Sequence, residues 1–408
     1  QMSIGLEYFT GLTYRLKNML TGEKRTLKTE YEDDADFSFW VRNIMRLWIS
    51  LVAGLIFLWL LKMNCDYFVS IGGALLYAVA PAAVMRATGQ ILVREMFCIP
   101  FIVSFFMCYL LYLLKPSRIK LVIIGISVYL SMAFWDMFML CIGFWGLFEI
   151  ISLFFSDFNE ISRKKSAYIV IYASAVISSI TVPYLKCHDT IFSPSVSVLL
   201  PSLVLSSLLF KENFGLRFRS SIIITIFAFF LVFRLIAGWG TFSENYSHFV
   251  PLLISKLRFL NVKPTDPSLL DFDSRILWTP ALHSATFSMT RFIFPAAFFV
   301  FLVYLAIYFI KNKTLRSPAG SGLLVFMSIV FFVLYVFMVR FHVLCIVFLC
   351  PAISLCFQSI YNSFNKRWIK IFLATSFVFA IICETDISAK LAETGGSYES
   401  DYPEETSG

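Results

Sequence analysis

The sequence predicts an all-α polytopic membrane protein, and three observations support this fold class. The 408 residues are 59% hydrophobic and only 15% charged, whereas soluble domains are about 25% charged. The mean hydropathy is +0.78. Runs such as Phe227–Phe233 and Phe298–Ile310 are apolar on every side, which is typical of helices surrounded by lipid or protein. This composition argues against a soluble enzyme, a disordered chain or a partner for nucleic acid.

The hydrocarbon core of a bilayer sets the length of each predicted element, at about 20 apolar residues for one helix. Apolar runs separated by polar breaks then predict 12 transmembrane helices. In chain order they cover residues 43–61, 67–82, 96–114, 119–134, 137–155, 167–185, 191–210, 220–238, 291–310, 321–339, 343–361 and 368–384.

The loops between these spans form two alternating sets, and one set is short and basic. The positive-inside rule places the basic loops in the cytoplasm and the other set in the lumen of a secretory membrane. The chain is therefore expected to be a multi-pass membrane protein with both ends in the lumen. The basic loops contain Lys62, Lys115, Arg118, Lys120, Arg163, Lys164, Lys165, Lys211, Arg217, Arg219, Lys311, Lys313, Arg316, Lys366, Arg367 and Lys370.

The orientation also predicts the domain organisation. Residues 1–42 are part of a lumenal loop, residues 43–384 form the transmembrane domain, and residues 385–408 begin a lumenal C-terminal region. A long lumenal loop covers residues 239–290 within the transmembrane domain. The absence of a signal sequence at Gln1 and the acidic tail indicate a fragment of a longer chain.

Ionisable residues at the ends of apolar spans are candidates for function, because they are costly there unless they meet water, a partner or a ligand. Arg86, Arg94 and Glu95 lie where the chain re-enters the membrane on the predicted lumenal side. A guanidinium has several N–H donors in one plane, which suits it to binding phosphate, and a neighbouring carboxylate can orient it. The alternative is a structural ion pair at the start of a helix.

Two lumenal corners carry further candidates. Arg340 and His342 lie between two long apolar runs, so the arginine either binds an anion or extends to the lipid headgroups. Trp135 and Asp136 interrupt another apolar stretch, where the tryptophan could also belong to an interfacial aromatic belt.

The long lumenal loop contains Asp271 and Asp273, two residues apart and beside Arg275. A D-x-D pair with a divalent ion suits sugar-nucleotide chemistry, although a solvated acidic loop explains the same pattern. The histidines and the nine cysteines lack the spacing of a metal site, so no metal and no cofactor are predicted. The collected charges suit an enzyme that uses a lipid-phosphate donor, an anion transporter or a lipid-binding assembly factor.

Four segments resemble the protein C-mannosyltransferases, the dumpy-nineteen-like family of the GT-C glycosyltransferase superfamily. They are the loop with Arg86, Arg94 and Glu95, and the stretches SMAFWDMF, LLDFDSRILWTPA and MVRFHVL. The resemblance covers about residues 35–395, and the Arg-Glu and Asp-Phe-Asp segments carry most of it.

The resemblance implies a GT-C bundle of about 12 helices in this chain and about 13 in the full protein. It also implies transfer of mannose from dolichyl-phosphate mannose to tryptophan in lumenal polypeptides, by a multi-pass enzyme of the endoplasmic reticulum membrane. Arg86, Arg94 and Arg340 would hold the donor phosphate, and Glu95 and His342 would orient them. Trp135, Asp136, Asp271 and Asp273 would lie near the acceptor or the lipid entrance.

The expected catalytic carboxylate belongs to a Glu-Met-Gly-Leu-aromatic stretch in the first lumenal loop of that family. If Gln1 and Met2 match this stretch, an amide that cannot act as a general base replaces the glutamate. The base would then lie upstream, or the chain would be a non-catalytic lipid-phosphate binding or transport protein. The catalytic subunit of oligosaccharyltransferase is a further alternative, although residues 90–95 lack its additional aspartate.

Overall fold

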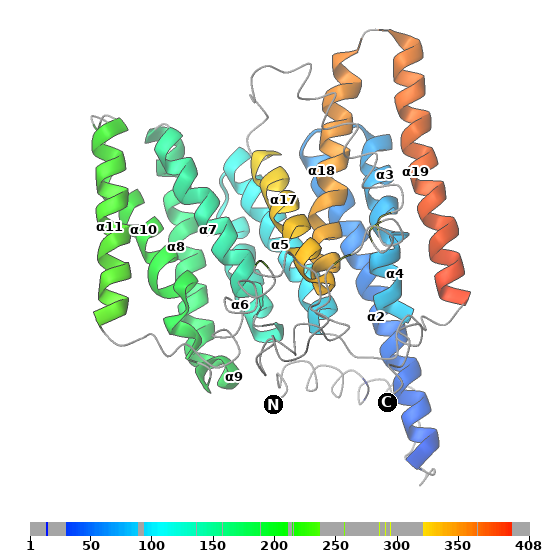
Figure 1. Ribbon diagram of the computed structural model, residues 1–408, viewed down its shortest axis with the longest axis horizontal. Helices are drawn as coiled ribbons and strands as arrows, with labels where there is room; N and C mark the ends of the chain where they lie inside the picture. The colour runs from blue at the N-terminus through cyan, green and yellow to red at the C-terminus, as the bar shows by residue number, and fades with distance from the viewer. Residues whose placement is uncertain are drawn as a thin grey trace. The chain divides into compact units, whose positions relative to one another are not determined.

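The computed structural model shows helices at most of the predicted spans (Figure 1). It describes residues 14, 30–88, 94–135, 137–156, 158–187, 189–210, 214, 216–236, 257, 285, 290, 294, 321–364 and 366–393.

Every regular element among the described residues is a helix, and helices lie at eleven of the 12 predicted spans. The remaining span, 291–310, lies outside the described residues apart from Phe294. By length and composition, six described helices could cross a membrane, and three shorter helices are also apolar. The prediction of an all-α polytopic membrane protein is therefore confirmed.

The chain divides into two compact units, each built from separate segments. Unit 1 contains residues 1–100, 278–316 and 331–408, and unit 2 contains residues 101–277 and 317–330. The helices of unit 1 are α2 (Glu30–Lys62), α3 (Tyr67–Ala78), α4 (Pro81–Thr88), the start of α5 (Arg94–Leu114), the end of α17 (Ser321–Phe337), η5 (Val339–Phe341), α18 (His342–Ser363) and α19 (Arg367–Glu393).

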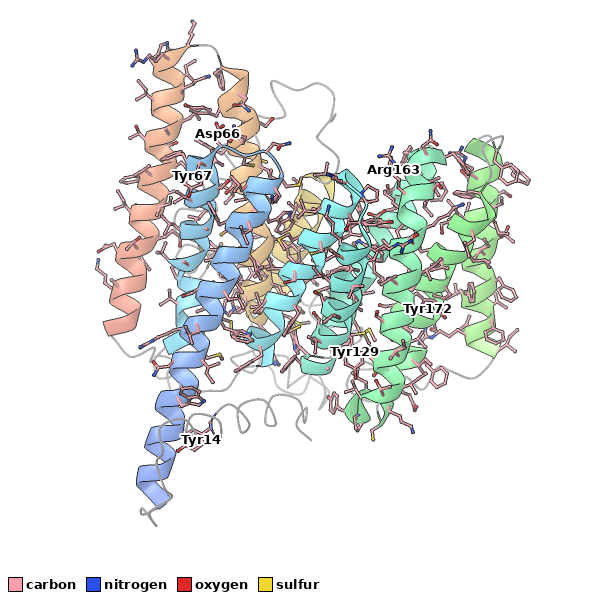
Figure 2. The ribbon with its side chains drawn as sticks, turned by 180° about the vertical axis from the view of Figure 1, so that it is seen from behind. Tyr14, Asp66, Tyr67, Tyr129, Arg163 and Tyr172 are labelled. Carbon is pink, nitrogen blue, oxygen red and sulfur yellow. The ribbon has the colours of Figure 1, made fainter. Side chains whose placement is uncertain are left out.

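Unit 1 is organised around α3, which packs against α2, α18 and α19. Two glycines permit this packing, because a Cβ at Gly72 would overlap the ring of Phe377 and one at Gly73 would overlap Ser354. The start of α3 is held by Gln358 of α18, which accepts a hydrogen bond from the Asp66 backbone N–H at 2.9 Å and donates to its carboxylate at 3.0 Å. Asp66 and Tyr67 are labelled at this turn in Figure 2.

The helices of unit 2 are the remainder of α5, α6 (Arg118–Phe134), α7 (Phe138–Phe155), α8 (Phe158–Thr181), α9 (Pro183–Cys187), η1 (Thr190–Phe192), η2 (Ser195–Leu199), α10 (Leu200–Leu209), α11 (Leu216–Ile236) and the start of α17. Helix α8 packs against α6 and α10, and α11 packs against α10. The hydroxyls of Tyr129 in α6 and Thr181 in α8 are 3.2 Å apart. An aromatic core of Phe105, Tyr109 and Trp145 joins α5 to α7.

Candidate functional site

The candidate residues predicted from the sequence lie on several helix ends, and the structure describes part of them. Arg86 lies in α4, while Arg94 and Glu95 begin α5; the side chains of all three lie outside the described part of the chain. Four further candidates lie entirely outside the described residues, namely Gln1, Asp136, Asp271 and Asp273. The predicted contacts of these side chains with a ligand or with one another remain predictions.

Helix α2 brings together the elements of unit 1 that carry the predicted phosphate ligands. It packs against both α4 and α18, and α4 also packs against α18. The indole of Trp48 in α2 donates a hydrogen bond to the Phe97 carbonyl at 3.2 Å, and the two rings are 5.9 Å apart. Phe97 is one turn after Arg94, so the first turn of α5 is fixed to the same helix.

The turn that carries Arg340 and His342 leads from α17 into α18. Met338 is extended, residues Val339–Phe341 form one 3₁₀ turn, and His342 is the first residue of α18. Arg340 is exposed, whereas only 4% of His342 is exposed. The two side chains therefore have different surroundings, although they are two residues apart.

The backbone fixes the protonated nitrogen of His342. Its Nδ1 lies 2.7 Å from the carbonyl oxygen of Val339. Since a carbonyl can only accept, Nδ1–H is the donor, and Nε2 carries the lone pair when the imidazole is neutral. Buried in this way, His342 holds the 3₁₀ turn against the start of α18.

Trp135 ends α6 in unit 2 and is buried, with only 5% of its surface exposed. Its extended backbone (φ −149°, ψ 114°) stops the helix, its N–H donates to the Ser131 carbonyl at 3.0 Å, and its own carbonyl accepts from Phe138 at 3.1 Å. A tryptophan of an interfacial belt would be exposed to lipid headgroups, so the burial favours packing inside unit 2 over that alternative.

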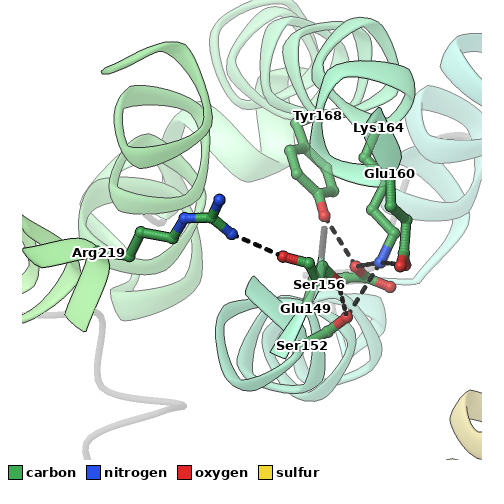
Figure 3. Close-up of polar contacts among 7 residues, drawn as sticks. All are labelled: Glu149, Ser152, Ser156, Glu160, Lys164, Tyr168 and Arg219. Atoms are coloured by element: carbon green, nitrogen blue, oxygen red, sulfur yellow. Dashed lines mark hydrogen bonds and ion pairs between the residues drawn. The ribbon is translucent and has the colours of Figure 1, made fainter. Parts of the chain in front are cut away.

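A cluster in unit 2 that contains a buried ion pair was not among the sequence candidates (Figure 3). The ammonium of Lys164 lies 3.0 Å from Oε2 of Glu149 and 2.8 Å from Oε1 of Glu160. It also donates to the Ser152 hydroxyl at 3.0 Å, and the hydroxyl of Tyr168 donates to the same Glu149 oxygen at 2.8 Å. We call Glu149, Ser152, Glu160, Lys164 and Tyr168 the α7–α8 polar cluster.

The α7–α8 polar cluster is closed on its apolar side by aromatic rings. Trp145 lies one turn before Glu149, and its ring is 5.9 Å from that of Tyr168 and 5.2 Å from that of Tyr109. Lys164 precedes the predicted span 167–185. Burial alone would lower the pKa of Lys164, but attraction to Glu149 and Glu160 outweighs it, so the pKa lies above its ordinary value. Lys164 is therefore charged at neutral pH.

The C-terminal end of α7, which follows the α7–α8 polar cluster, is in contact with the cation Arg219. Arg219 of α11 donates through its terminal nitrogen to the carbonyl of Ser156 at 2.9 Å, and its guanidinium lies 5.9 Å from the ring of Phe210. Ser156 is the residue at which α7 ends. A cation at this place compensates the negative end of the helix dipole and satisfies one terminal carbonyl.

One sequence signal could have found the α7–α8 polar cluster. Glu149 is the single acidic residue of the apolar run CIGFWGLFEIISLFF, and a lone carboxylate in such a run requires a partner. The positive-inside rule instead assigns Lys164, with Arg163 and Lys165, to a basic loop that reports orientation. Lys164 and Tyr168 lie four residues apart in α8 and hence on one face of that helix.

The described residues contain no group of three His, Cys, Asp or Glu side chains that could hold a metal ion. The cysteines are free thiols, and most are buried among apolar side chains, as their positions in apolar runs predict.

A comparison with solved structures finds chains of similar fold, whereas the comparisons by sequence find none. No protein-family profile matches the sequence, and no curated protein sequence matches it. A crystal structure of similar fold is that of the Archaeoglobus fulgidus oligosaccharyltransferase tethered with an acceptor peptide containing the NVT sequon via a disulfide bond. The TM-score is 0.48 at 14% identity, over 89% of this chain and 44% of that one. The present chain thus spans less than half the length of that protein.

Proposed function

We propose that the chain is a membrane glycosyltransferase of the C-mannosyltransferase type. In this proposal it takes mannose from dolichyl-phosphate mannose and transfers it to tryptophan side chains of lumenal polypeptides. The assignment of this reaction rests on the sequence segments that resemble that family. The packing of unit 1 supplies the observation that carries the proposal, because α2 contacts both α4 and α18 and is tied to the first turn of α5.

These three elements carry Arg86, Arg94 and the turn with Arg340. A donor with one phosphate needs cationic side chains, and arginines on helix ends fixed by a common neighbour provide a preorganised set. Arg340 is exposed at the 3₁₀ turn that precedes α18. His342 acts on the site through the backbone, because its ring holds the carbonyl of Val339 in the same turn.

The test is a transfer assay in microsomes that carry the full-length protein with glutamate at position 1. The substrates are dolichyl-phosphate mannose and a peptide with a W-x-x-W sequence. We expect mannosylated tryptophan from this protein, and a strong loss of product with Arg86→Lys. Arg163→Lys is the matched control, because Arg163 is an exposed residue near the start of α8 in unit 2 (Figure 2). No mannosylated peptide from the glutamate form would contradict the proposed reaction.

A second candidate is a lipid-phosphate binding or transport protein without transferase activity, which the glutamine at position 1 favours. The same assay separates the two. Donor binding that depends on Arg86, without product from either the glutamine or the glutamate form, would support the second candidate.

A further inference from the structure

Helix α19 has one face packed in unit 1 and one face exposed. The buried face consists of Leu373, Phe377, Ala380 and Glu384, which follow one another at intervals of three or four residues. The exposed face follows the same period on the opposite side. Its large apolar side chains are Trp368 (67% exposed), Ile371 (56%), Phe372 (68%), Phe379 (64%) and Ile382 (57%).

This exposed face is a mainly apolar strip, interrupted only by the exposed Thr375, whose hydroxyl donates to the Ile371 carbonyl at 2.8 Å. Because a helix turns by about 100° per residue, these five exposed side chains lie on one side of the helix. The strip is about 21 Å long at 1.5 Å per residue, which exceeds half of the hydrocarbon thickness of a bilayer. Helix α19 is also among the helices that could cross a membrane, over Arg367–Ile387.

Exposed positive charges lie at one end of this strip. Lys366 and Arg367 immediately precede Trp368, and both are exposed. Within the described part of the chain, neither side chain has a carboxylate partner. The nearby Lys370 instead has an aromatic partner, because its ammonium lies 5.0 Å from the centre of the Tyr361 ring. The sequence places this end in the cytoplasm, where the leaflet surface carries anionic lipids.

We propose that this face of α19 binds an anionic phospholipid of the cytoplasmic leaflet. Lys366 and Arg367 bind the headgroup phosphate, the indole of Trp368 lies at the level of the headgroups, and an acyl chain lies along Phe372 and Phe379. The charges favour a lipid over a second protein helix, because a protein partner would have to offer an anion at the level of the lipid phosphates. The inference does not depend on the proposed transferase activity.

The test uses tryptophan quenching by brominated lipids in vesicles that contain the full chain. The probe is the difference in fluorescence between the wild type and Trp368→Phe, which isolates this one tryptophan. Brominated phosphatidylserine is compared with brominated phosphatidylcholine at equal mole fractions. We expect at least twofold stronger quenching of the Trp368 fluorescence by phosphatidylserine, and loss of this preference in Lys366→Gln/Arg367→Gln.

A matched control removes two positive charges at the predicted cytoplasmic end of unit 2. Arg163→Gln/Lys165→Gln should keep the preference for phosphatidylserine, because both residues lie on α8. Equal quenching by both lipids in the wild type would overturn the proposal, since it would indicate unselective lipid contact. Weak quenching by both would also overturn it, because the face would then be covered by protein. A preference that survives Lys366→Gln/Arg367→Gln would exclude these cations as the headgroup ligands.

Discussion

The ammonium of Lys164 lies 3.0 Å from the carboxylate of Glu149, and 3% and 2% of the two side chains are exposed. Glu149 is the single acidic residue of α7, and Lys164 belongs to the next helix, α8. A buried ion pair of this kind contributes little net stability compared with apolar residues of the same volume. The pairing is nevertheless required, because burying either charge without its partner would cost a large free energy.

The first prediction is a double-mutant cycle on this pair. Lys164→Met leaves the Glu149 carboxylate buried without its cation and should lower the free energy of unfolding by about 3–5 kcal/mol. Adding Glu149→Leu removes the orphaned charge and should restore most of this loss. Reversible unfolding of the purified protein in mixed micelles measures both changes.

Lys165→Met is the control for the cycle, because its ammonium lies 5.4 Å from the Phe158 ring and forms no part of the α7–α8 polar cluster. It should change the stability by about 1 kcal/mol or less, which is the usual range for surface charges. Additive losses from Lys164→Met and Glu149→Leu would contradict the energetic coupling of the pair.

The helices could be predicted from sequence because the bilayer imposes their length. The breaks at Lys62, Lys115, Trp135 and Ser156 each fall within a few residues of an observed helix end. The division into two units could not be predicted, because it depends on which apolar faces pack together. Hydropathy is high on all sides of these helices and does not distinguish such faces.

The candidate site shows the same limit. The positions of Arg340 and His342 at a turn between two apolar runs could be predicted, and the structure places them on η5 and at the start of α18. The difference in exposure between these two side chains could not be predicted, because it depends on the contacts of one 3₁₀ turn. The partnership of Glu149 with Lys164 was missed because charge counting assigns a loop lysine to orientation before any pairing is considered.

The second prediction tests the close packing of α3. Gly73→Ala should destabilise unit 1 by about 1–3 kcal/mol, because a Cβ there would overlap Ser354 of α18 and Leu60 of α2. Gly54→Ala is the control, since no atom outside its own helix lies within 4 Å of a Cβ at this position. It should be neutral or raise the stability by up to about 1 kcal/mol through helix propensity. Equal effects of the two substitutions on the unfolding transition would contradict the packing.

The third prediction concerns Cys65, in the turn between α2 and α3. Burial and the neighbouring Asp66 raise the pKa of its thiol to about 12, from an ordinary value of 9.0. The folded state therefore holds this proton more tightly than the unfolded state. The resulting stabilisation is complete below about pH 9 and is lost as the pH rises towards 12.

Alkylation followed by mass spectrometry measures this directly, because the thiolate is the reactive form. Between pH 8 and pH 9.5, iodoacetamide should modify Cys65 only after the protein is unfolded in detergent. The exposed Cys187 should react in the folded protein and provides the internal control. Rapid modification of Cys65 in the folded protein at pH 8 would show that the turn is open.

The fourth prediction concerns Arg340 as a ligand of the donor phosphate. Arg340→Lys keeps the positive charge but loses the two parallel N–H donors of the guanidinium, so a bidentate phosphate contact should weaken by about 1.5–3 kcal/mol. This corresponds to a loss of roughly ten- to hundredfold in affinity for dolichyl-phosphate mannose. The affinity for the acceptor peptide should be nearly unchanged, and binding of both ligands can be followed with the purified protein.

The exposure of Arg340 makes this test specific, because an exposed side chain at the 3₁₀ turn can change without creating a buried cavity. Replacing the buried His342 instead would remove the hydrogen bond to Val339 and alter the turn itself. Equal losses for donor and peptide from Arg340→Lys would indicate a damaged fold rather than a lost phosphate contact. Unchanged affinity for both would show that Arg340 extends into the lipid headgroups, and the phosphate would then depend on the arginines of α4 and α5.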